Sequence, residues 1–364
     1  MESLDRFQIR FTPLAERENR VDITRDHVAA DAEPGPLTEH QNAIMAKSAR
    51  AIRSARERKA AVMLTFGAHA IKNGLGPVIN ALMADGWVTH LATNGAGVIH
   101  DWEFAYLGKS SEHVAENVAN GQFGLWEETG FCINLAIAIG AWQGLGYGES
   151  VGAMIANNGL EIPTTRALRA QVEASGRQKP QRAAAALDLA WAIDKFELPH
   201  GLMEIPHPYA EYSVQATAYR LGVPFTSHPM FGHDIIYTHP MSIGAAIGRT
   251  AERDFLRFAQ SVSQLEHGVY MSVGSAVMSP MVFEKSLSMA QNLALQSGEP
   301  LRNHKMLVVD LARSEWDWSK GEPPESDPAY YLRYCKSFSR MGGEMQYLSA
   351  DNRDFLLALR RELA

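Results

Sequence analysis

Short apolar runs and longer amphipathic stretches alternate along most of this chain. Residues 61–66 form a continuous apolar run, Ala-Val-Met-Leu-Thr-Phe, that predicts a buried strand. A glycine-bearing turn over 67–74 and a helical stretch over 75–84 follow it, and then a second strand over 87–93. An Asn-Gly-Ala-Gly turn separates that strand from a helix beginning near Ile99. This β-α-β-α order, with glycines where the strands end, indicates a parallel sheet covered by helices.

The alternation pauses in the middle of the chain and returns after residue 209. Helical periodicity covers 129–142, 164–173 and 181–195, interrupted by Gly144-Leu-Gly-Tyr-Gly148. Beyond it, the pattern predicts helices over 209–221, 251–265 and 281–295, and strands over 223–226, 268–273, 306–310 and 344–348. We therefore expect an α/β fold over 46–364, with one large, mostly parallel sheet, helices on both faces and a helical insertion around 129–200.

Residues 1–45 differ from the rest of the chain. They are polar, and the stretch over 31–39 is acidic and contains proline and glycine. Residues 43–58 are rich in Ala and Arg and predict a helix. Residues 1–25 are charged throughout and lack the apolar segment of a secretion signal. We predict an N-terminal polar and helical extension, an arm that lies outside the central core.

Composition and charge narrow the function classes. The chain has 364 residues, of which 46% are hydrophobic and 21% charged, which is ordinary for a globular protein. The formal net charge of -7 disfavours attraction to phosphate backbones, so we expect no nucleic acid and no membrane among the partners. Cys132 and Cys335 are far apart, which disfavours a disulfide framework and favours a cytoplasmic location. No apolar run approaches the roughly 20 residues of a membrane helix.

Four predicted strand ends carry glycine beside polar residues. They are Gly67-Ala-His69, Thr93-Asn-Gly-Ala-Gly97, Gly232-His-Asp234 and Gly274-Ser275. None matches the Gly-x-Gly-x-x-Gly fingerprint of dinucleotide-binding sheets. Glycine turns that open helices still expose backbone N–H groups that suit phosphates, so we predict a nucleotide crevice here. Each glycine can also serve a tight turn alone, and that interpretation stays open.

The segment His100-Asp-Trp-Glu103 carries the richest chemistry at these ends. His100 is a candidate for proton transfer, and Asp101 and Glu103 are candidate anchors for a cationic or hydroxyl-bearing substrate. Asp101 can instead be a capping carboxylate at a helix N-terminus. Trp102 is either an apolar wall of the site or a core residue.

A second polar segment follows the predicted strand at 223–226. It holds His228, His233, Asp234 and His239 within twelve residues, a set that transition metals favour, although the spacing matches no standard ligand pattern. We prefer a ligand-facing loop in which His233 and Asp234 form hydrogen bonds. The pair Glu127-Glu128 is either active-site carboxylate or an acidic start to a helix.

Several familiar catalytic signatures do not occur. The sequence has no Gly-x-Ser-x-Gly elbow, P-loop or His-Glu-x-x-His, which disfavours the hydrolases, NTPases and zinc proteases that use them. Lys72, Lys285 and Lys336 are possible imine-forming lysines, with a solvated surface role as the alternative for each.

The residues over 64–108 resemble deoxyhypusine synthase and its distant homologues. The matching motifs are Gly74-Leu-Gly-Pro-Val-Ile-Asn-Ala-Leu82, Val88-Thr-His-Leu-Ala-Thr-Asn-Gly-Ala-Gly97 and His100-Asp-x-Glu103. Downstream, Val223-Pro-Phe followed by Gly232-His-Asp234, and Gly274-Ser-Ala-Val277 with Pro280 and Asn292, are similar to further blocks of that family. The pattern Asn94, His100-Asp-x-Glu103 and Gly108-x-Ser110 also resembles the NAD-using ornithine cyclodeaminase domain of bifunctional arginine-degrading enzymes.

The resemblance implies a Rossmann-like sheet, NAD at the strand ends and a polyamine-type substrate held by carboxylates. It also implies a homo-oligomer, a dimer or tetramer, in which the polar arm covers a neighbour's site. Two departures limit it. Gly274-Ser-Ala replaces a run of three glycines, and the family's Trp-Gly-Lys motif is not recognisable near Asp327-Pro-Ala-Tyr-Tyr-Leu-Arg-Tyr-Cys-Lys336. Deoxyhypusine synthesis itself is therefore not expected.

The sequence leads us to expect an NAD(P)-binding transferase, oxidoreductase or deaminase that acts on a small amine, amino acid or polar metabolite. The expected catalytic residues are His100, Asp101, Glu103 and His233. The expected contacts to NAD or NADP are Thr93, Asn94, Gly95, Gly97, Asp234, Gly274 and Ser275. The expected substrate contacts are His69, Trp102 and Glu128. Two alternatives are a metal-dependent lyase or hydrolase using His228, His233 and His239, and a non-catalytic nucleotide sensor.

Overall fold

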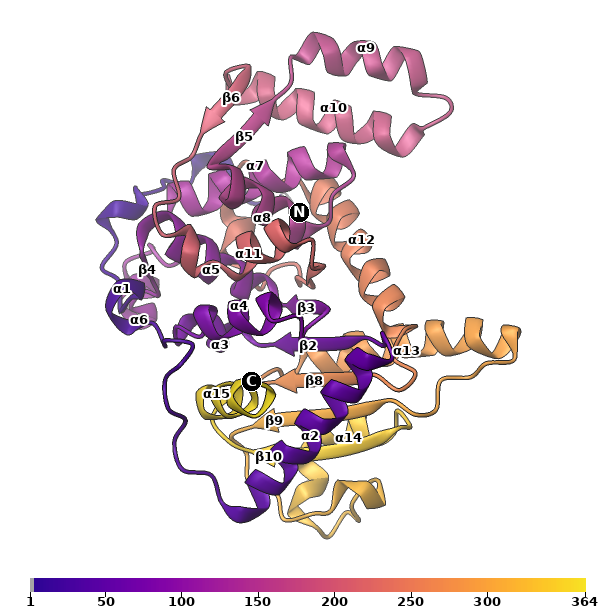
Figure 1. Ribbon diagram of the computed structural model, residues 1–364. Helices are drawn as coiled ribbons and strands as arrows, with labels where there is room; N and C mark the ends of the chain where they lie inside the picture. Colours follow the sequence, from indigo (N-terminus) through magenta and orange to yellow (C-terminus); the bar gives the residue numbers. More distant parts are fainter. Residues whose placement is uncertain (1–2) are drawn as a thin grey trace.

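The computed structural model describes residues 3–364 and is built around a six-stranded sheet whose neighbouring strands all run parallel (Figure 1). Its strands are β2 (Val62–Phe66), β3 (His90–Thr93), β7 (Phe225–Ser227), β8 (Val269–Val273), β9 (Lys305–Asp310) and β10 (Glu344–Ser349). Their order across the sheet is β10-β9-β8-β2-β3-β7. Numbered along the chain and read from β7, this is the order 3-2-1-4-5-6 of doubly wound, Rossmann-like sheets. The predicted fold class is confirmed.

The strand order fixes where ligands are expected. The chain leaves β2 toward β3 on one side and later returns to β8 on the other side, so the topological switch point lies between β2 and β8. In such sheets ligands bind outside the carboxyl ends of the strands at this point. Leu64 on β2 pairs with Leu91 on β3 and with Met271 on β8, so the carboxyl ends of these three strands stay in step.

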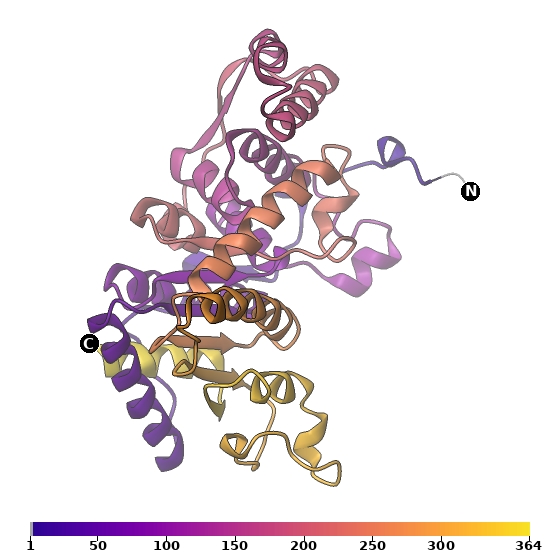
Figure 2. The ribbon, with the colours of Figure 1, turned by 90° about the vertical axis from the view of Figure 1, so that its right-hand side faces the viewer.

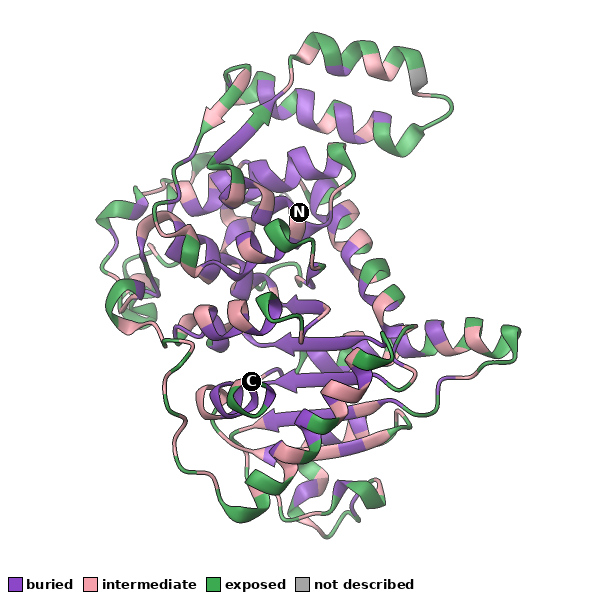
Figure 3. Cartoon of the chain, viewed as in Figure 1, coloured by how far each residue is buried: buried purple, intermediate pink, exposed green. Residues whose placement is uncertain are grey.

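The two faces of the sheet bury different side chains because successive strand residues point to opposite faces. Val62, Leu64 and Phe66 join one apolar core with α2, α4 and α15, whereas Met63 and Tyr270 join a second core with α12, α13 and α14. Figure 2 shows α2 on one side of the strands, and Figure 3 shows β2, β3 and β8 buried along their length. These helices are α2 (Glu39–Glu57), α4 (Gly76–Ala84), α12 (Gly244–Val262), α13 (Met278–Ser297), α14 (Arg333–Ser339) and α15 (Asn352–Leu363).

The residues between β3 and β7 build a helical body beside the sheet. α9, α10, β5 and β6 lie at its far end from the sheet (Figure 1). The elements are α5 (Gly95–Leu107), β4 (Lys109–Ser110), α6 (Val114–Ala119), α7 (Glu127–Gln143), α8 (Tyr147–Asn157), β5 (Gly159–Ile162), α9 (Thr165–Ser175), α10 (Pro180–Lys195), β6 (Gly201–Glu204) and α11 (Val214–Leu221). β5 and β6 form an antiparallel pair.

Helix α7 is the apolar centre of this body, and most of its residues are buried. Among residues 3–364 no single helix is long and apolar enough to cross a membrane. The pair α7 and α8 passes that test only when taken together, across a bend of 111°.

The N-terminal arm packs on its own chain. Thr12 N donates to Leu125 O (3.0 Å), Ile23 N to Gly108 O (2.8 Å) and Val28 N to Gly74 O (2.9 Å). The arm contains β1 (Val21–Asp22), which pairs antiparallel with β4, and the short α1 (Ile23–Asp26). It thus lies against α5 and the turn after α3 (Ala68–Lys72) of its own chain.

Candidate functional site

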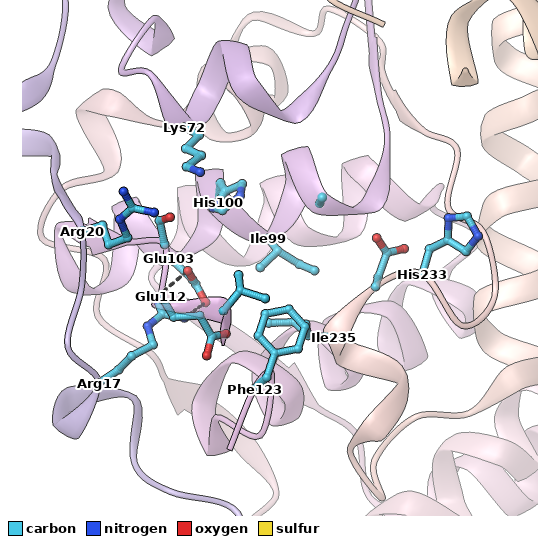
Figure 4. Close-up of a pocket in the computed structure, with 14 residues that line it drawn as sticks. Arg17, Arg20, Lys72, Ile99, His100, Glu103, Glu112, Phe123, His233 and Ile235 are labelled. Atoms are coloured by element: carbon cyan, nitrogen blue, oxygen red, sulfur yellow. Dashed lines mark hydrogen bonds and ion pairs between the residues drawn. The ribbon is translucent and has the colours of Figure 1, made fainter. Parts of the chain in front are cut away.

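A cavity of about 250 Å³ lies beside α5, near the carboxyl ends of β2 and β3 (Figure 4). Its walls come from five segments that are far apart in the sequence. They are the arm (Arg17, Arg20), α3 (Lys72), α5 (Ala96, Ile99, His100, Glu103), the segment after β4 (Ser111, Glu112, Val114, Phe123) and the loop after β7 (His233, Asp234, Ile235). Cavities of this size accommodate small metabolites rather than a whole dinucleotide.

Glu103 is the centre of a buried polar network at the base of the cavity. Arg17 binds it through the two terminal guanidinium nitrogens, Nη1 to Oε1 at 2.8 Å and Nη2 to Oε2 at 2.6 Å. Ser110 Oγ donates to Oε2 (2.5 Å) and Thr129 Oγ1 donates to Oε1 (3.0 Å). Burial alone would raise the pKa of Glu103, but the Arg17 charge and these donors outweigh it, so the pKa lies below its usual range. The carboxylate is charged and fully occupied within the protein.

His100 connects this network to the cavity. Its Nδ1 lies 2.7 Å from Ser110 Oγ. Because Ser110 gives its only proton to Glu103, the His100 Nδ1–H must donate to Ser110, which leaves Nε2 with a free lone pair. Burial lowers the pKa of His100 to about 4, against the opposing charge of Glu103. At neutral pH the imidazole is therefore a neutral group whose Nε2 can accept a proton.

Asp101 and Trp102 point away from the cavity. The Asp101 carboxylate accepts from Ser213 Oγ (2.6 Å), Val214 N (2.8 Å) and both Gln215 N and Nε2 (3.2 and 2.9 Å), and so caps α11. Trp102 is fully buried and stacks on Tyr106 at 4.8 Å between ring centroids. The structure gives Asp101 the capping role and Trp102 the core role that the sequence left open.

The predicted phosphate turn at the start of α5 is closed by the protein's own groups. Asn94 Oδ1 accepts from Gly97 N (2.9 Å), and Thr93 is buried with its hydroxyl donating to Phe66 O (2.9 Å). The carboxylate of Asp234 lies against Gly95, where an added Cβ would come within 2.1 Å of Oδ2. A diphosphate bound at this turn would meet Asp234, so Thr93, Asn94, Gly95, Gly97 and Asp234 do not fit that role in this arrangement.

Asp234 and His233 instead line the cavity. Burial raises the pKa of Asp234 to about 6, and its Oδ2 is a buried oxygen with no hydrogen-bond partner among the described residues. His233 is exposed and lies across the cavity from Lys72 and Arg20 (Figure 4). The sequence placed both residues at a ligand, and the structure brings them to the same cavity as His100.

Gly274 and Ser275 lie at the switch point, where the ends of β2 and β8 touch. A Cβ on Gly67 would lie 2.1 Å from Gly274 O, and Gly274 itself has a φ of 57°. Ser275 Oγ accepts from Ser279 N (3.3 Å) in the first turn of α13. His69 is exposed on α3, one turn before Lys72, and does not line the cavity.

The other histidines of the β7 loop are dispersed. His228 is buried beside Thr226 (3.2 Å from Nε2 to Oγ1), and His239 is buried with Nδ1 accepting from Met241 N (3.0 Å). Glu128 accepts from Leu14 N (2.6 Å) and so fixes the arm. Within residues 3–364, no group of three or more His, Cys, Asp or Glu side chains is placed to hold a metal ion.

Sequence reasoning missed much of the cavity wall. Arg17 and Arg20 read as ordinary charges of a polar arm, and Glu112 and Phe123 follow no motif. Ser110 was visible only as part of Gly108-x-Ser110, and Lys72 only as a possible imine-forming lysine. No local signal marks such residues, because contacts across the chain bring them together.

Comparisons with known proteins give a weak likeness in structure and none in sequence. No protein-family model and no curated protein matches this chain. Among solved structures, unliganded AgrE is 14% identical, with a TM-score of 0.42 and coverage of 90% of this chain and 33% of its own. ArgZ, an arginine dihydrolase from the ornithine-ammonia cycle in cyanobacteria, is 13% identical, with a TM-score of 0.42 and coverage of 90% and 33%.

A LOR/SDH protein from Methanococcus maripaludis S2 is 12% identical, with a TM-score of 0.41 and coverage of 92% of this chain and 72% of its own. This chain thus spans about a third of the length of AgrE and ArgZ.

Proposed function

We propose that this protein is an NAD(P)-linked enzyme that acts on a small polar metabolite bound in the cavity beside α5, with His100 as the proton carrier. The observation that carries the proposal is the chain of hydrogen bonds from His100 through Ser110 to Glu103. It holds the imidazole in one tautomer and directs Nε2 away from the network. At neutral pH this histidine is unprotonated and can accept a proton at Nε2, although its pKa of about 4 makes it a weaker base than a histidine whose pKa lies near 7.

The other network residues have positioning roles in this proposal. Arg17 keeps Glu103 ionised, and Glu103 orients the Ser110 hydroxyl toward itself. An imidazolium formed at His100 would gain from the nearby Glu103 charge, which raises the pKa of His100 against the larger effect of burial. Glu103 thus assists proton uptake without contacting the substrate.

The nicotinamide part of the proposal rests on the sequence motifs and the strand order, and the dinucleotide is proposed at the switch point instead of the α5 turn. Two exposed apolar side chains that follow the neighbouring strands support this position. Val277, after β8, and Leu311, after β9, are 63% and 70% exposed, as apolar surfaces for flat rings would be. Ser275 supplies a hydroxyl in the turn that precedes Val277, whereas the N–H groups of Gly67 and Gly274 already donate to Val273 O and Val309 O. A bound NAD(P) supplies a hydride acceptor or donor.

An amino acid, amine or hydroxy acid is the proposed substrate class, and deoxyhypusine synthesis is not proposed because the lysine motif is missing. A homo-oligomer and a cytoplasmic location remain predictions.

The test combines binding with turnover. Calorimetric titration of the purified protein with NAD+, NADH, NADP+ and NADPH should show binding of one pair, and Val277→Asp should weaken it by about tenfold or more because it charges the ring surface. Leu293→Asp is the matched control, since Leu293 is 66% exposed farther along α13. A screen of small amino acids, amines and hydroxy acids, followed by nicotinamide absorbance, should find a substrate whose kcat falls roughly a hundredfold or more in His100→Gln.

Ser110→Ala tests whether Ser110 positions the His100 ring. It should lower kcat less than His100→Gln does and shift the acid limb of the pH profile, because it frees the imidazole from the Glu103 network. Equal dinucleotide affinity in Val277→Asp and wild type would overturn the cofactor site. Full turnover in His100→Gln would overturn the proton-transfer role.

A further inference from the structure

Some of the charged side chains that line the cavity have partners within the protein, and others have none. Arg17 is paired with Glu103. Glu112 is likewise occupied: it accepts from Trp126 Nε1 (3.0 Å), from Gly124 N (3.2 Å) and from Asn117 Nδ2 (2.6 Å).

Two cations remain. Within the part of the chain that the structure describes, the side chains of Arg20 and Lys72 form no ion pair and no hydrogen bond. Both lie on the same side of the cavity as His100 (Figure 4).

Arg20 is held at this position by the arm. Its backbone N donates to Ser111 O (2.8 Å), and the next residue, Val21, pairs with Ser110 in the antiparallel β1-β4 ribbon. Ser111 itself lines the cavity and has a φ of 74°, a left-handed conformation that a serine rarely adopts. The ribbon thus places Arg20 beside Ser111, the residue that comes directly after Ser110 of the Glu103 network.

Lys72 comes from a different segment, helix α3. It is the last residue of α3, is half-buried, and its charge contributes to lowering the pKa of His100. The surrounding walls are apolar, since Ile99, Val114, Phe123 and Ile235 face the same cavity. Arg20 and Lys72 outnumber the single unpartnered carboxylate of Asp234 in a pocket of about 250 Å³. This excess of positive charge, together with the apolar side chains, is complementary to a small organic anion with a short carbon chain.

We propose that the cavity binds a small anionic metabolite by its carboxylate or phosphate group, between Arg20 and Lys72, and that it rejects polyamines. This inference rests on the proposed function only in placing the substrate in the same cavity. It reverses the charge that the sequence led us to expect, because Asp101 and Glu103 are both paired inside the protein, and the unpaired Arg20 and Lys72 outnumber the unpaired Asp234. An anionic group held beside His100 brings the atoms bonded to it toward Nε2.

Calorimetric titration without cofactor or turnover tests the inference on its own. The probes are pyruvate and L-alanine for carboxylates, inorganic phosphate for phosphate, and putrescine for polyamines. We expect one class of anion to bind at millimolar concentration or below, and the comparison of pyruvate with phosphate identifies the class. Arg20→Gln and Lys72→Gln should each weaken that binding by about tenfold or more.

Matched controls are Arg10→Gln, an exposed arginine of the same arm, and Lys109→Gln, an exposed lysine of β4. Both lie outside the cavity and should bind the anion as the wild type does. Binding of putrescine in preference to both anions, or unchanged anion affinity in Arg20→Gln and Lys72→Gln, would overturn the inference. Anion binding that depends on Arg20 and Lys72 stands even if His100→Gln retains turnover, so the two proposals fail separately.

Discussion

The carboxylate of Asp234 rests against the backbone of Gly95, where an added Cβ would lie 2.1 Å from Oδ2. This contact joins the loop after β7 to the first turn of α5, and so fixes one wall of the cavity relative to His100.

Gly95→Ala should therefore disturb the cavity as well as the fold. The methyl group must displace Asp234, and we expect a loss of about 1–3 kcal/mol in the free energy of unfolding. Gly248→Ala is the control, because Gly248 is also helical and a Cβ there would meet nothing within 4 Å. That substitution should be neutral or stabilise by up to about 1 kcal/mol. Urea unfolding of both variants measures the difference, and equal stability would argue against the Asp234 contact.

The buried pair of Arg17 and Glu103 should carry much of the attachment of the arm. Arg17→Met leaves the Glu103 charge buried without its cation, and we expect a loss of about 3–5 kcal/mol. The double variant Arg17→Met with Glu103→Gln should lose less than the single one, since no buried charge then remains. The exposed pair Arg169 and Asp194 is the comparison, and Asp194→Asn should cost at most about 1 kcal/mol. Similar losses in both pairs would contradict the buried role.

Asp254 should make stability fall as pH rises. It is fully buried, and burial raises its pKa to about 7 although Gly148 N and Ser227 N donate to Oδ2 (2.9 and 2.8 Å). Between the unfolded value of 3.8 and about 7 the unfolded state ionises while the folded state keeps its proton, so the group costs about 1.4 kcal/mol for each pH unit in this window. Asp254→Asn should remove that dependence. Unfolding curves between pH 4 and pH 8 test it, and a parallel pH dependence in both proteins would contradict the assignment.

His90 and His228 should have the opposite effect. They share Thr226, whose Oγ1 lies 3.0 Å from His90 Nε2 and 3.2 Å from His228 Nε2. Burial lowers the pKa of each to about 3, so below the usual value of 6.5 the unfolded chain takes up protons that the folded chain does not. Stability is present above that value and falls as the pH decreases toward 3, by about 1.4 kcal/mol per unit for each histidine.

His228→Gln should reduce the loss of unfolding free energy at acid pH by the contribution of one histidine. His267→Gln is the control, because His267 is about half exposed on the surface. The comparison of unfolding free energies at pH 7 and pH 5 decides between them, and an unchanged acid loss in His228→Gln would show that the histidine is not held neutral.

The sequence predicted the sheet well because its signals are local. The apolar run at 61–66 became β2, and the predicted strands at 268–273 and 306–310 became β8 and β9. The start of a helix differs from the predicted position where a side-chain cap sets it. Helix α5 begins at Gly95 instead of near Ile99, because the Asn94 side chain accepts from Gly97 N and so caps the helix at this position. The predicted glycine turn is therefore the first turn of the helix.

The same distinction between local and long-range contacts applies to the candidate site. His100 was visible in the sequence as a polar residue just after a strand, and the structure places it in a cavity. Its neighbour Asp101 was equally visible, yet successive helical residues are turned by roughly 100° from one another, so it faces α11. No periodicity in the sequence reports which side of α5 would be covered by another helix and which would stay open.

The sequence by itself determined the strands, the alternating faces of the sheet and the concentration of polar residues at the strand ends, because each depends on neighbours a few positions apart. Only the tertiary structure decided the charge that the cavity offers to a ligand. Arg17 contacts Glu103 across 86 positions of the sequence, and Ser213 contacts Asp101 across 112 positions. Both carboxylates therefore already have partners inside the protein. The cations of Arg20 and Lys72 are left facing the cavity, because pairing of charges depends on distance in space and not along the chain.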